Sequence, residues 1–173
     1  MDATAKKLVE RLNRLEDERF RANQEIRGII MEVRTAFTVR ARLVGYRHET
    51  DKDFHIVIAD LQDLTISMVV EIPDSQCAGV CASPKLREIQ QAREKFVKPF
   101  PTAQPAPEFV VVQGDVEVEV TGVGFFDFAH GQTGLAHNCI ELHPVLDINF
   151  PQPGPFQAKI DPAGEPPKRP ESW

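Results

Sequence analysis

The chain has 173 residues, of which 42% are hydrophobic and 27% are charged, and its formal net charge is −6. This composition is typical of a globular protein, and the length suits one domain with appendages. No stretch approaches the ~20 apolar residues of a membrane-spanning helix, and the charged N-terminus lacks the apolar core of a signal peptide. We therefore expect a cytoplasmic protein with no membrane contact.

Residues 1–34 carry a regular helical pattern. Apolar side chains recur at alternating spacings of four and three, with Arg19 as the one charged member; the apolar members are Leu8, Leu12, Leu15, Ala22, Ile26, Ile29 and Val33. Such a heptad pattern predicts a long amphipathic helix. The helix either forms a coiled coil between subunits or packs on its own subunit. We favour the first alternative, a homo-oligomer assembled through residues 8–33.

Residues 35–150 predict a β-barrel domain. Alternating apolar residues over 37–44, 54–59 and 66–72 indicate a three-stranded meander. Ser83 and Pro84 are a typical helix start, and the amphipathic pattern after them runs to about Lys98.

Further strands follow that helix. Residues 109–120 predict one bulged strand or two short ones, and Cys139–Ile148 is the last strand, where Pro144 indicates an edge position or a bulge. Three strands, a helix and then more strands is the order of an OB-fold. We therefore predict a mainly β protein, an OB-fold-like small barrel of five to six strands with one helix between strands three and four.

Proline and cysteine usage adds two expectations. Seven of the 14 prolines fall within residues 151–173, which predicts a tail that is disordered or wraps the surface. The three cysteines, Cys77, Cys81 and Cys139, lack the second pair that a zinc finger needs. We expect them to be small buried residues.

Two acid–histidine pairs stand out in the predicted strands. Asp53 precedes His55 by two residues, and Glu141 precedes His143 by two. Side chains at positions i and i+2 of a strand point to the same face, roughly 6–7 Å apart. The alternation of apolar residues places both pairs on the polar, outer face of their strands. Whether the two strands lie close together decides whether the pairs form one site.

The pairs have three interpretations. A divalent metal site, holding Zn or Mn, would draw its ligands from Asp51, Asp53, His55, Glu71, His130, Glu141 and His143. A metal-bound water would then support hydrolysis of a phosphoester or an amide. Cross-strand pairs of this kind are also ordinary on a solvent-facing sheet. We favour a structural polar network over the metal site, and the metal site over metal-free acid–base catalysis.

Nucleic-acid binding is a separate functional hypothesis. Arg40, Arg42 and Arg47 are the candidate cationic residues of the barrel. Residues 99–158 contain no Lys or Arg but seven acidic residues, and aromatic residues are only 8% of the chain. Single-stranded nucleic acids need a basic groove with stacking aromatics, so this hypothesis is disfavoured.

Several motifs together resemble a family of uncharacterised bacterial OB-fold-like proteins. They are Asp51-x-Asp53-x-His55, Glu71-Ile72-Pro73, the segments 122–127 and 130–134, and Ile140-Glu141-Leu142-His143-Pro144-Val145. The resemblance spans residues 37–148. It implies no activity, marks the same acid–histidine positions, and implies that related proteins are exported. We predict a binding or interaction module of unknown ligand, with the metal-dependent hydrolase and the single-stranded nucleic-acid binder as alternatives.

Overall fold

The computed structural model describes residues 35–100, 108–127 and 133–160. In chain order they form β1 (Ala36–His48), β2 (Phe54–Ala59), β3 (Ser67–Ile72), α2 (Ala78–Cys81), α3 (Leu86–Val97), β4 (Val110–Val112), β5 (Glu117–Phe126), β6 (Ile140–Asn149) and β7 (Ala158–Ile160). The heptad segment and its predicted self-association lie outside the described residues, as does His130. In the described part, no helix is long and apolar enough to cross a membrane.

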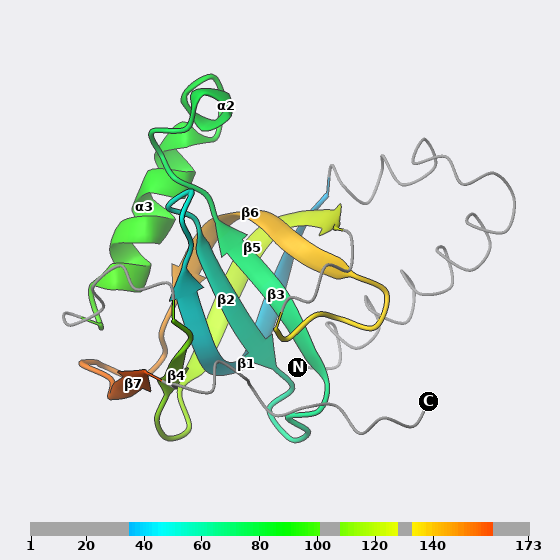
Figure 1. Ribbon diagram of the computed structural model, residues 1–173, viewed down its shortest axis with the longest axis vertical. Coiled ribbons are helices and arrows are strands. Elements are labelled where there is room, and N and C mark those ends of the chain that lie inside the picture. The colour runs from blue at the N-terminus through cyan, green and yellow to red at the C-terminus, as the bar shows by residue number, and fades with distance from the viewer. Residues whose placement is uncertain (1–34, 101–107, 128–132, 161–173) are drawn as a thin grey trace, which may run out of the picture.

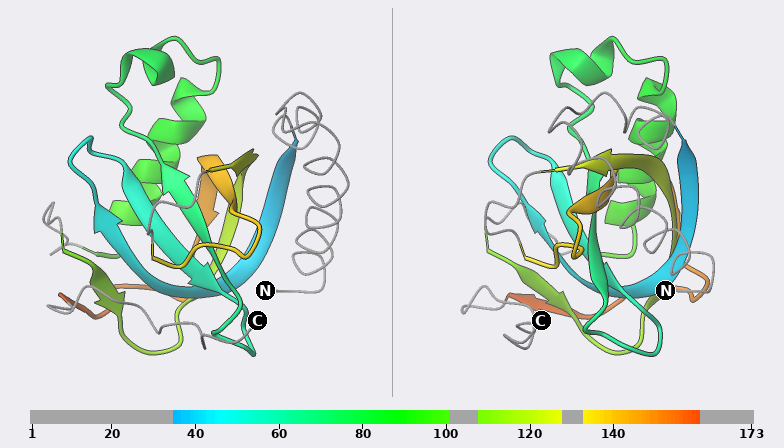
Figure 2. Two further views of the ribbon diagram at one scale, coloured as in Figure 1. Left: turned by 45° about the vertical axis from the view of Figure 1, so that its right-hand side comes forward. Right: turned by 90° about the vertical axis from the view of Figure 1, so that its right-hand side faces the viewer.

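Five strands close into a barrel (Figures 1 and 2). β1, β2 and β3 form the predicted antiparallel meander; β3 then pairs in parallel with β6, β6 pairs with β5, and β5 returns to β1. A bulge between Leu43 and Gly45 divides β1, so that its first half pairs with β5 and its second half with β2. One long bent strand thereby closes the barrel. β4 and β7 extend the sheet beyond β1. The prediction of a mainly β barrel is confirmed.

The barrel interior holds the residues that the alternation predicted. Val39, Ala41 and Leu43 of β1 are buried, and Ile56 and Ile58 of β2 join the same core. α3 lies beside the barrel (Figure 2) and packs on it through Ile89, Ala92 and Phe96. The helix begins two residues later than Pro84 predicted. The Ser83 hydroxyl instead accepts a hydrogen bond from the Lys85 amide at 3.1 Å, in a turn that precedes the helix.

The structure narrows one sequence prediction, corrects a second and adds a strand that was not predicted. Pro144 does not mark an edge, because β6 lies between β3 and β5; the β5–β6 register shifts nearby, which fits the bulge alternative. Cys77 and Cys81 are exposed and Cys139 is half-buried, because α2 has no buried residue and Cys139 lies in the turn before β6. Residues 151–160 contain a strand that the sequence did not predict, β7, which pairs with β4.

Candidate acid–histidine site

Strand β3 lies between the two strands that carry the acid–histidine pairs. His55 of β2 is in register with Glu71 of β3, and Val69 of β3 is in register with Glu141 of β6. Glu71 therefore stands between His55 on one side and His143 on the other. The two pairs converge, and the third strand supplies the carboxylate that joins them.

Hydrogen bonds link these side chains into one network. His55 lies with Nε2 3.1 Å from the Thr133 carbonyl oxygen and with Nδ1 3.0 Å from Glu71 Oε1. The carbonyl only accepts, so Nε2 carries a proton; an ionised carboxylate also only accepts, so Nδ1 carries one too. This arrangement favours the imidazolium form of His55. His143 Nδ1 lies 3.1 Å from both Glu71 Oε2 and Glu141 Oε1, and donates to this pair of carboxylates.

Much of the network is buried, although the alternation predicted a solvent-facing surface. The side chains of His55 and Glu141 are 5% and 2% exposed, and those of Glu71 and His143 are 17% and 31% exposed. Part of the cover is the segment 133–139, whose Thr133 carbonyl contacts His55. Gly134 packs so closely on Val57, on the outer face of β2, that a Cβ atom there would overlap the valine. Strand alternation cannot reveal a loop that covers a strand's outer face.

The central residues have strongly shifted pKa values. Burial alone would raise the pKa of Glu71, but hydrogen bonds from His143 and His55 lower it to about 2. Burial likewise would lower the pKa of His143, yet its bonds to Glu141 and Glu71 raise it to about 10. The pKa of His55 is also raised, because its bonds to Glu71 and the Thr133 carbonyl outweigh burial. Glu71 is thus an anion held between two cations.

Two further carboxyls behave in the opposite way. Burial raises the pKa of Glu141, and the nearby Glu71 charge adds to the effect. Burial also raises the pKa of Asp53, although the Asp74 amide donates to its Oδ1 at 2.6 Å. These two groups bind a proton more readily than ordinary carboxyls do, so the site contains both strongly and weakly acidic groups.

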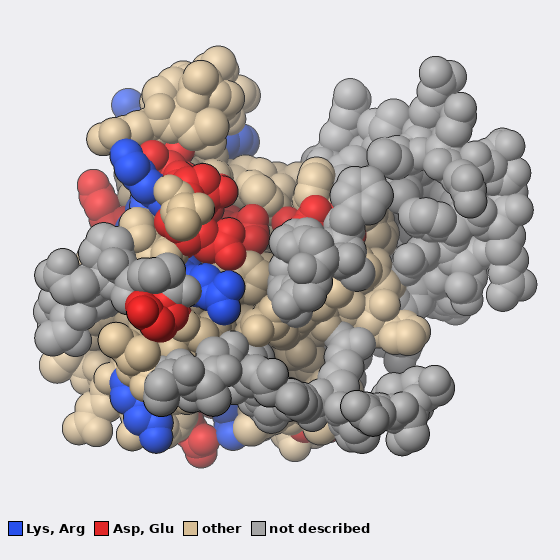
Figure 3. Space-filling model, viewed as in Figure 1, with Lys and Arg blue, Asp and Glu red and all other residues tan. Residues whose placement is uncertain are grey.

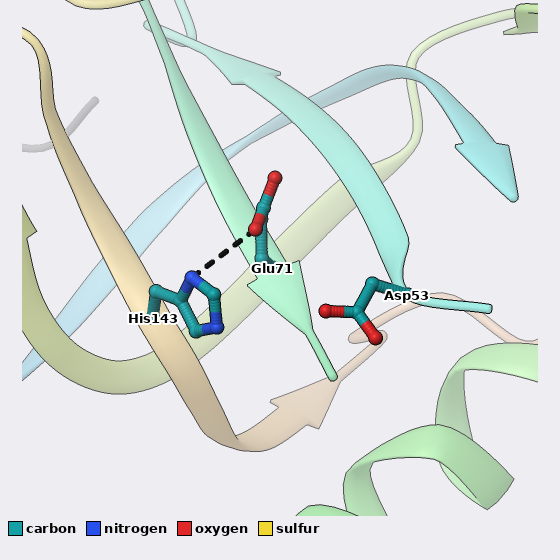
Figure 4. Close-up of side chains that lie close together, drawn as sticks. All are labelled: Asp53, Glu71 and His143. Atoms are coloured by element: carbon teal, nitrogen blue, oxygen red, sulfur yellow. Dashed lines mark ion pairs between the residues drawn. The ribbon is translucent and has the colours of Figure 1, made fainter. Parts of the chain in front are cut away.

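Three members of the network are placed to share a ligand. Asp53, Glu71 and His143 each offer one atom, and these atoms lie within 4.8 Å of one another. Figure 4 shows their side chains converging from the chain before β2, from β3 and from β6. The other described candidates do not join this group. Asp51 is exposed, with its carboxylate accepting the Asp53 amide at 3.1 Å, and His55 and Glu141 lie behind as hydrogen-bond partners.

Sequence reasoning missed two supports of the site. The Thr133 carbonyl, which fixes the protonation of His55, left no signal in the sequence because backbone atoms are common to all residues. Arg93 of α3 donates to the carbonyls of Ile72, Pro73 and Lys52, and its guanidinium lies 4.5 Å from the Phe54 ring centre. It ties together the chain ends that carry Asp53 and Glu71. Beyond the position of Arg93 on the predicted helix, nothing in the sequence indicated this role.

The three arginines of the nucleic-acid hypothesis do not lie together. Arg40 donates to Glu117, and Arg42 pairs with Asp115 at 3.1 Å. Arg47 lies beside His55, roughly 16 Å farther along β1 than Arg42. Figure 3 shows acidic side chains gathered over the ends of β2 and β3 on the face that carries the site, which is opposite to the charge that binds phosphates.

Comparison of the chain with known protein families, with curated proteins and with solved structures found no match. The family resemblance of the motifs stays a prediction. The function has to be inferred from the chemistry of the site, since a barrel by itself does not determine an activity.

Proposed function

We propose that the protein is a binding module on an OB-like barrel, and that its acid–histidine site binds a divalent cation. The OB-like assignment is supported by the barrel order β1-β2-β3-β6-β5, by the parallel β3–β6 pair, and by α3, which follows the third barrel strand. The observation that carries the cation proposal is the convergence of one ligand atom each from Asp53, Glu71 and His143 within 4.8 Å.

The hydrogen bonds of His143 suit this role. Its Nδ1 is directed at Glu141 and Glu71, which leaves Nε2 as the nitrogen to bind a cation. A carboxylate behind a histidine that orients the ring and raises its basicity is the usual arrangement around metal-binding histidines. Carboxylate and imidazole ligands together suit Zn²⁺ or Mn²⁺. A cation bound there would act as a Lewis acid toward a water or a ligand oxygen.

Protons compete with the cation. His143, with a pKa of about 10, must release its Nε2 proton before that nitrogen binds a metal. The apparent affinity should therefore rise with pH, and buffers at pH 8 should favour binding over buffers at pH 6. A cation that bound only to exposed carboxylates would show little change over this range, because those carboxylates are already ionised at pH 6.

Isothermal titration of the full chain with ZnCl₂ and with MnCl₂ tests the proposal. We expect one cation per chain, and a loss of affinity of at least about tenfold in each of Asp53→Asn and His143→Gln. Asp51→Asn is the matched control, because Asp51 lies two residues from Asp53 but outside the group of three. Equal affinity in all four proteins, or no saturable binding at pH 8, would leave the site a structural network.

The hydrolase hypothesis depends on this cation and stays a prediction. Its nucleophile would be a cation-bound water, and its test is metal-dependent cleavage of a phosphoester or an amide that His143→Gln abolishes. Self-association through residues 8–33 also stays a prediction. If the heptad segment holds subunits together, removal of residues 1–33 should lower the number of subunits per particle, as measured by the mass in solution.

A further inference from the structure

A second site lies at the C-terminal end of α3. A cavity of about 440 Å³ opens between the C-terminal turn of the helix and residues 148–155, and it shares no residue with the acid–histidine site. Its apolar walls are Pro99, Ile148, Phe150, Pro153 and Pro155. Cavities that hold small organic ligands have this size and this mainly apolar lining.

Hydrogen bonds and close packing hold the walls in place. Lys95 Nζ of α3 donates to Asp147 Oδ1 at 2.7 Å and to Asn149 Oδ1 at 3.0 Å. The Phe156 amide donates to the Pro99 carbonyl at 3.0 Å, which fixes the segment against the end of the helix. At Gly154 a Cβ atom would lie only 2.9 Å from the Pro99 Cβ, so the chain passes too close for a side chain. The cavity is therefore preformed, which lowers the entropic cost of binding.

The aromatic rings behind the cavity add rigidity. Phe150 packs against Phe156 with ring centres 5.3 Å apart, and both contact Phe100, at 6.1 Å and 5.7 Å. Phe150 thus presents to the cavity a ring that is braced from behind. A flat apolar ligand gains contact area there without reordering the wall.

The charge at the rim selects the ligand. Of the two lysines that line the cavity, Lys95 is engaged by Asp147 and Asn149. Lys98 is exposed, and within the described residues its ammonium has no ion-pair partner. Apolar walls beside a spare ammonium are complementary to a molecule with an apolar body and one anionic group.

We propose that this cavity binds a small organic acid, with an aromatic or aliphatic body against Pro99 and Phe150 and its carboxylate at Lys98. This inference is independent of the cation proposal, because the two sites have no residue in common. The ligand class is set by one cation and several apolar walls, so a neutral molecule of the same shape binds more weakly.

The test compares 1-naphthoate with 1-naphthalenemethanol, its neutral analogue, by titration of the full chain followed by ¹⁵N chemical shifts. We expect saturable binding of the acid, with the largest shift changes at the amides of Lys98, Asn149 and Gly154. Lys98→Met should lower the affinity for the acid by roughly 3- to 10-fold and leave the affinity for the neutral analogue unchanged. Pro153→Glu places a carboxylate at an exposed position on the rim of the cavity. It should also weaken binding of the acid, because the two negative charges repel each other.

Lys85→Met is the matched control. Lys85 precedes the same helix, about 20 Å from Lys98, and is paired with Glu88. Its replacement should leave the affinity for 1-naphthoate unchanged. Shift changes confined to other surfaces, no saturation up to the solubility limit of the acid, or equal effects of Lys98→Met and Lys85→Met would each overturn the proposal.

Discussion

The outer face of β2, β3 and β6 and the outer face of β1 and β5 carry the same kinds of cross-strand polar pairs, but among the described residues a loop covers only the first. On the covered face, His55 and Glu71 are 5% and 17% exposed. On the open face, Arg40 and Glu117 are 51% and 31% exposed, and Thr38 and Thr121 join their hydroxyls at 2.8 Å in solvent. Both faces look alike in the sequence.

In the part of the chain that the structure describes, the two faces differ by one covering segment, residues 133–139. Residues 133–139 lie over the β2 face and contribute a carbonyl to His55, and no described segment does the same for Arg40 and Glu117. Ion pairs in solvent contribute about 0–1 kcal/mol, whereas breaking a buried pair by removing one partner is far more costly. The same residue types should therefore contribute differently to stability on the two faces. Four predictions test this difference.

The largest effect is expected from Glu71→Gln. The change removes the anion between two imidazolium groups and leaves His55 buried and charged, or forces it to lose a proton. We expect the free energy of unfolding in urea to fall by about 3–5 kcal/mol at pH 7. Glu117→Gln, the corresponding change on the open face, should lower it by no more than about 1 kcal/mol. Similar losses in the two variants would show that the covering segment has no energetic consequence.

Gly134→Ala tests the covering segment itself. Gly134 has a φ of +78°, and an alanine Cβ would overlap Val57. We expect a loss of about 2–3 kcal/mol from backbone strain and overpacking together.

Gly114→Ala separates these two contributions. Gly114 has nearly the same φ, +80°, but open space where the Cβ would lie, so only the backbone cost of about 1 kcal/mol remains. NMR titration should also show that Gly134→Ala lowers the pKa of His55, as the Thr133 carbonyl moves away. An unchanged His55 pKa with a large stability loss would mean that the segment packs on Val57 without holding the network.

Two groups on the covered face should make the free energy of unfolding depend on pH, in opposite directions. His143 has a pKa of about 10 against an ordinary value of 6.5, so its stabilisation is complete below pH 6.5 and is lost as the pH rises toward 10. Glu71 has a pKa of about 2 against 4.5, so its stabilisation is present above pH 4.5 and is lost as the pH falls toward 2. Both contributions are therefore present between pH 4.5 and 6.5.

Urea unfolding at pH 6.5 and pH 9 measures this dependence. The free energy of unfolding should fall by up to about 1.4 kcal/mol per pH unit above 6.5, and His143→Asn should flatten the decline. A profile that is level from pH 6.5 to 9 in the unaltered protein would contradict a protonated His143.

The smallest effect concerns the open face. A double-mutant cycle with Arg40→Ala and Glu117→Ala should give a coupling of about 0.2–1 kcal/mol, which 0.5 M NaCl reduces further because both groups are in solvent. A coupling above 2 kcal/mol would remove the distinction between the two faces.

Much of the fold was predictable because strand alternation is a local property. The alternation over residues 54–59 predicted a strand, and its apolar residues Phe54, Ile56 and Ile58 are all buried. The helix was placed by its amphipathic pattern, with an error of two residues at its start because Ser83 caps a turn instead. β7 was missed, since three residues in a proline-rich segment have too little pattern to predict a strand. The predicted burial of Cys77 and Cys81 was wrong, because the exposure of a short helix depends on what packs beside it.

The sequence by itself determined the barrel, the helix between its strands, and the presence of two acid–histidine pairs on outward positions. Only the tertiary structure decided that they meet, because β3 places Glu71 between strands that are more than eighty residues apart in the chain. It also decided their charge states, because the Thr133 carbonyl and the burial of His55 arise from a loop that packs over the barrel. Local patterns record which face a side chain takes, whereas distance to a charge and exclusion of water depend on the whole fold.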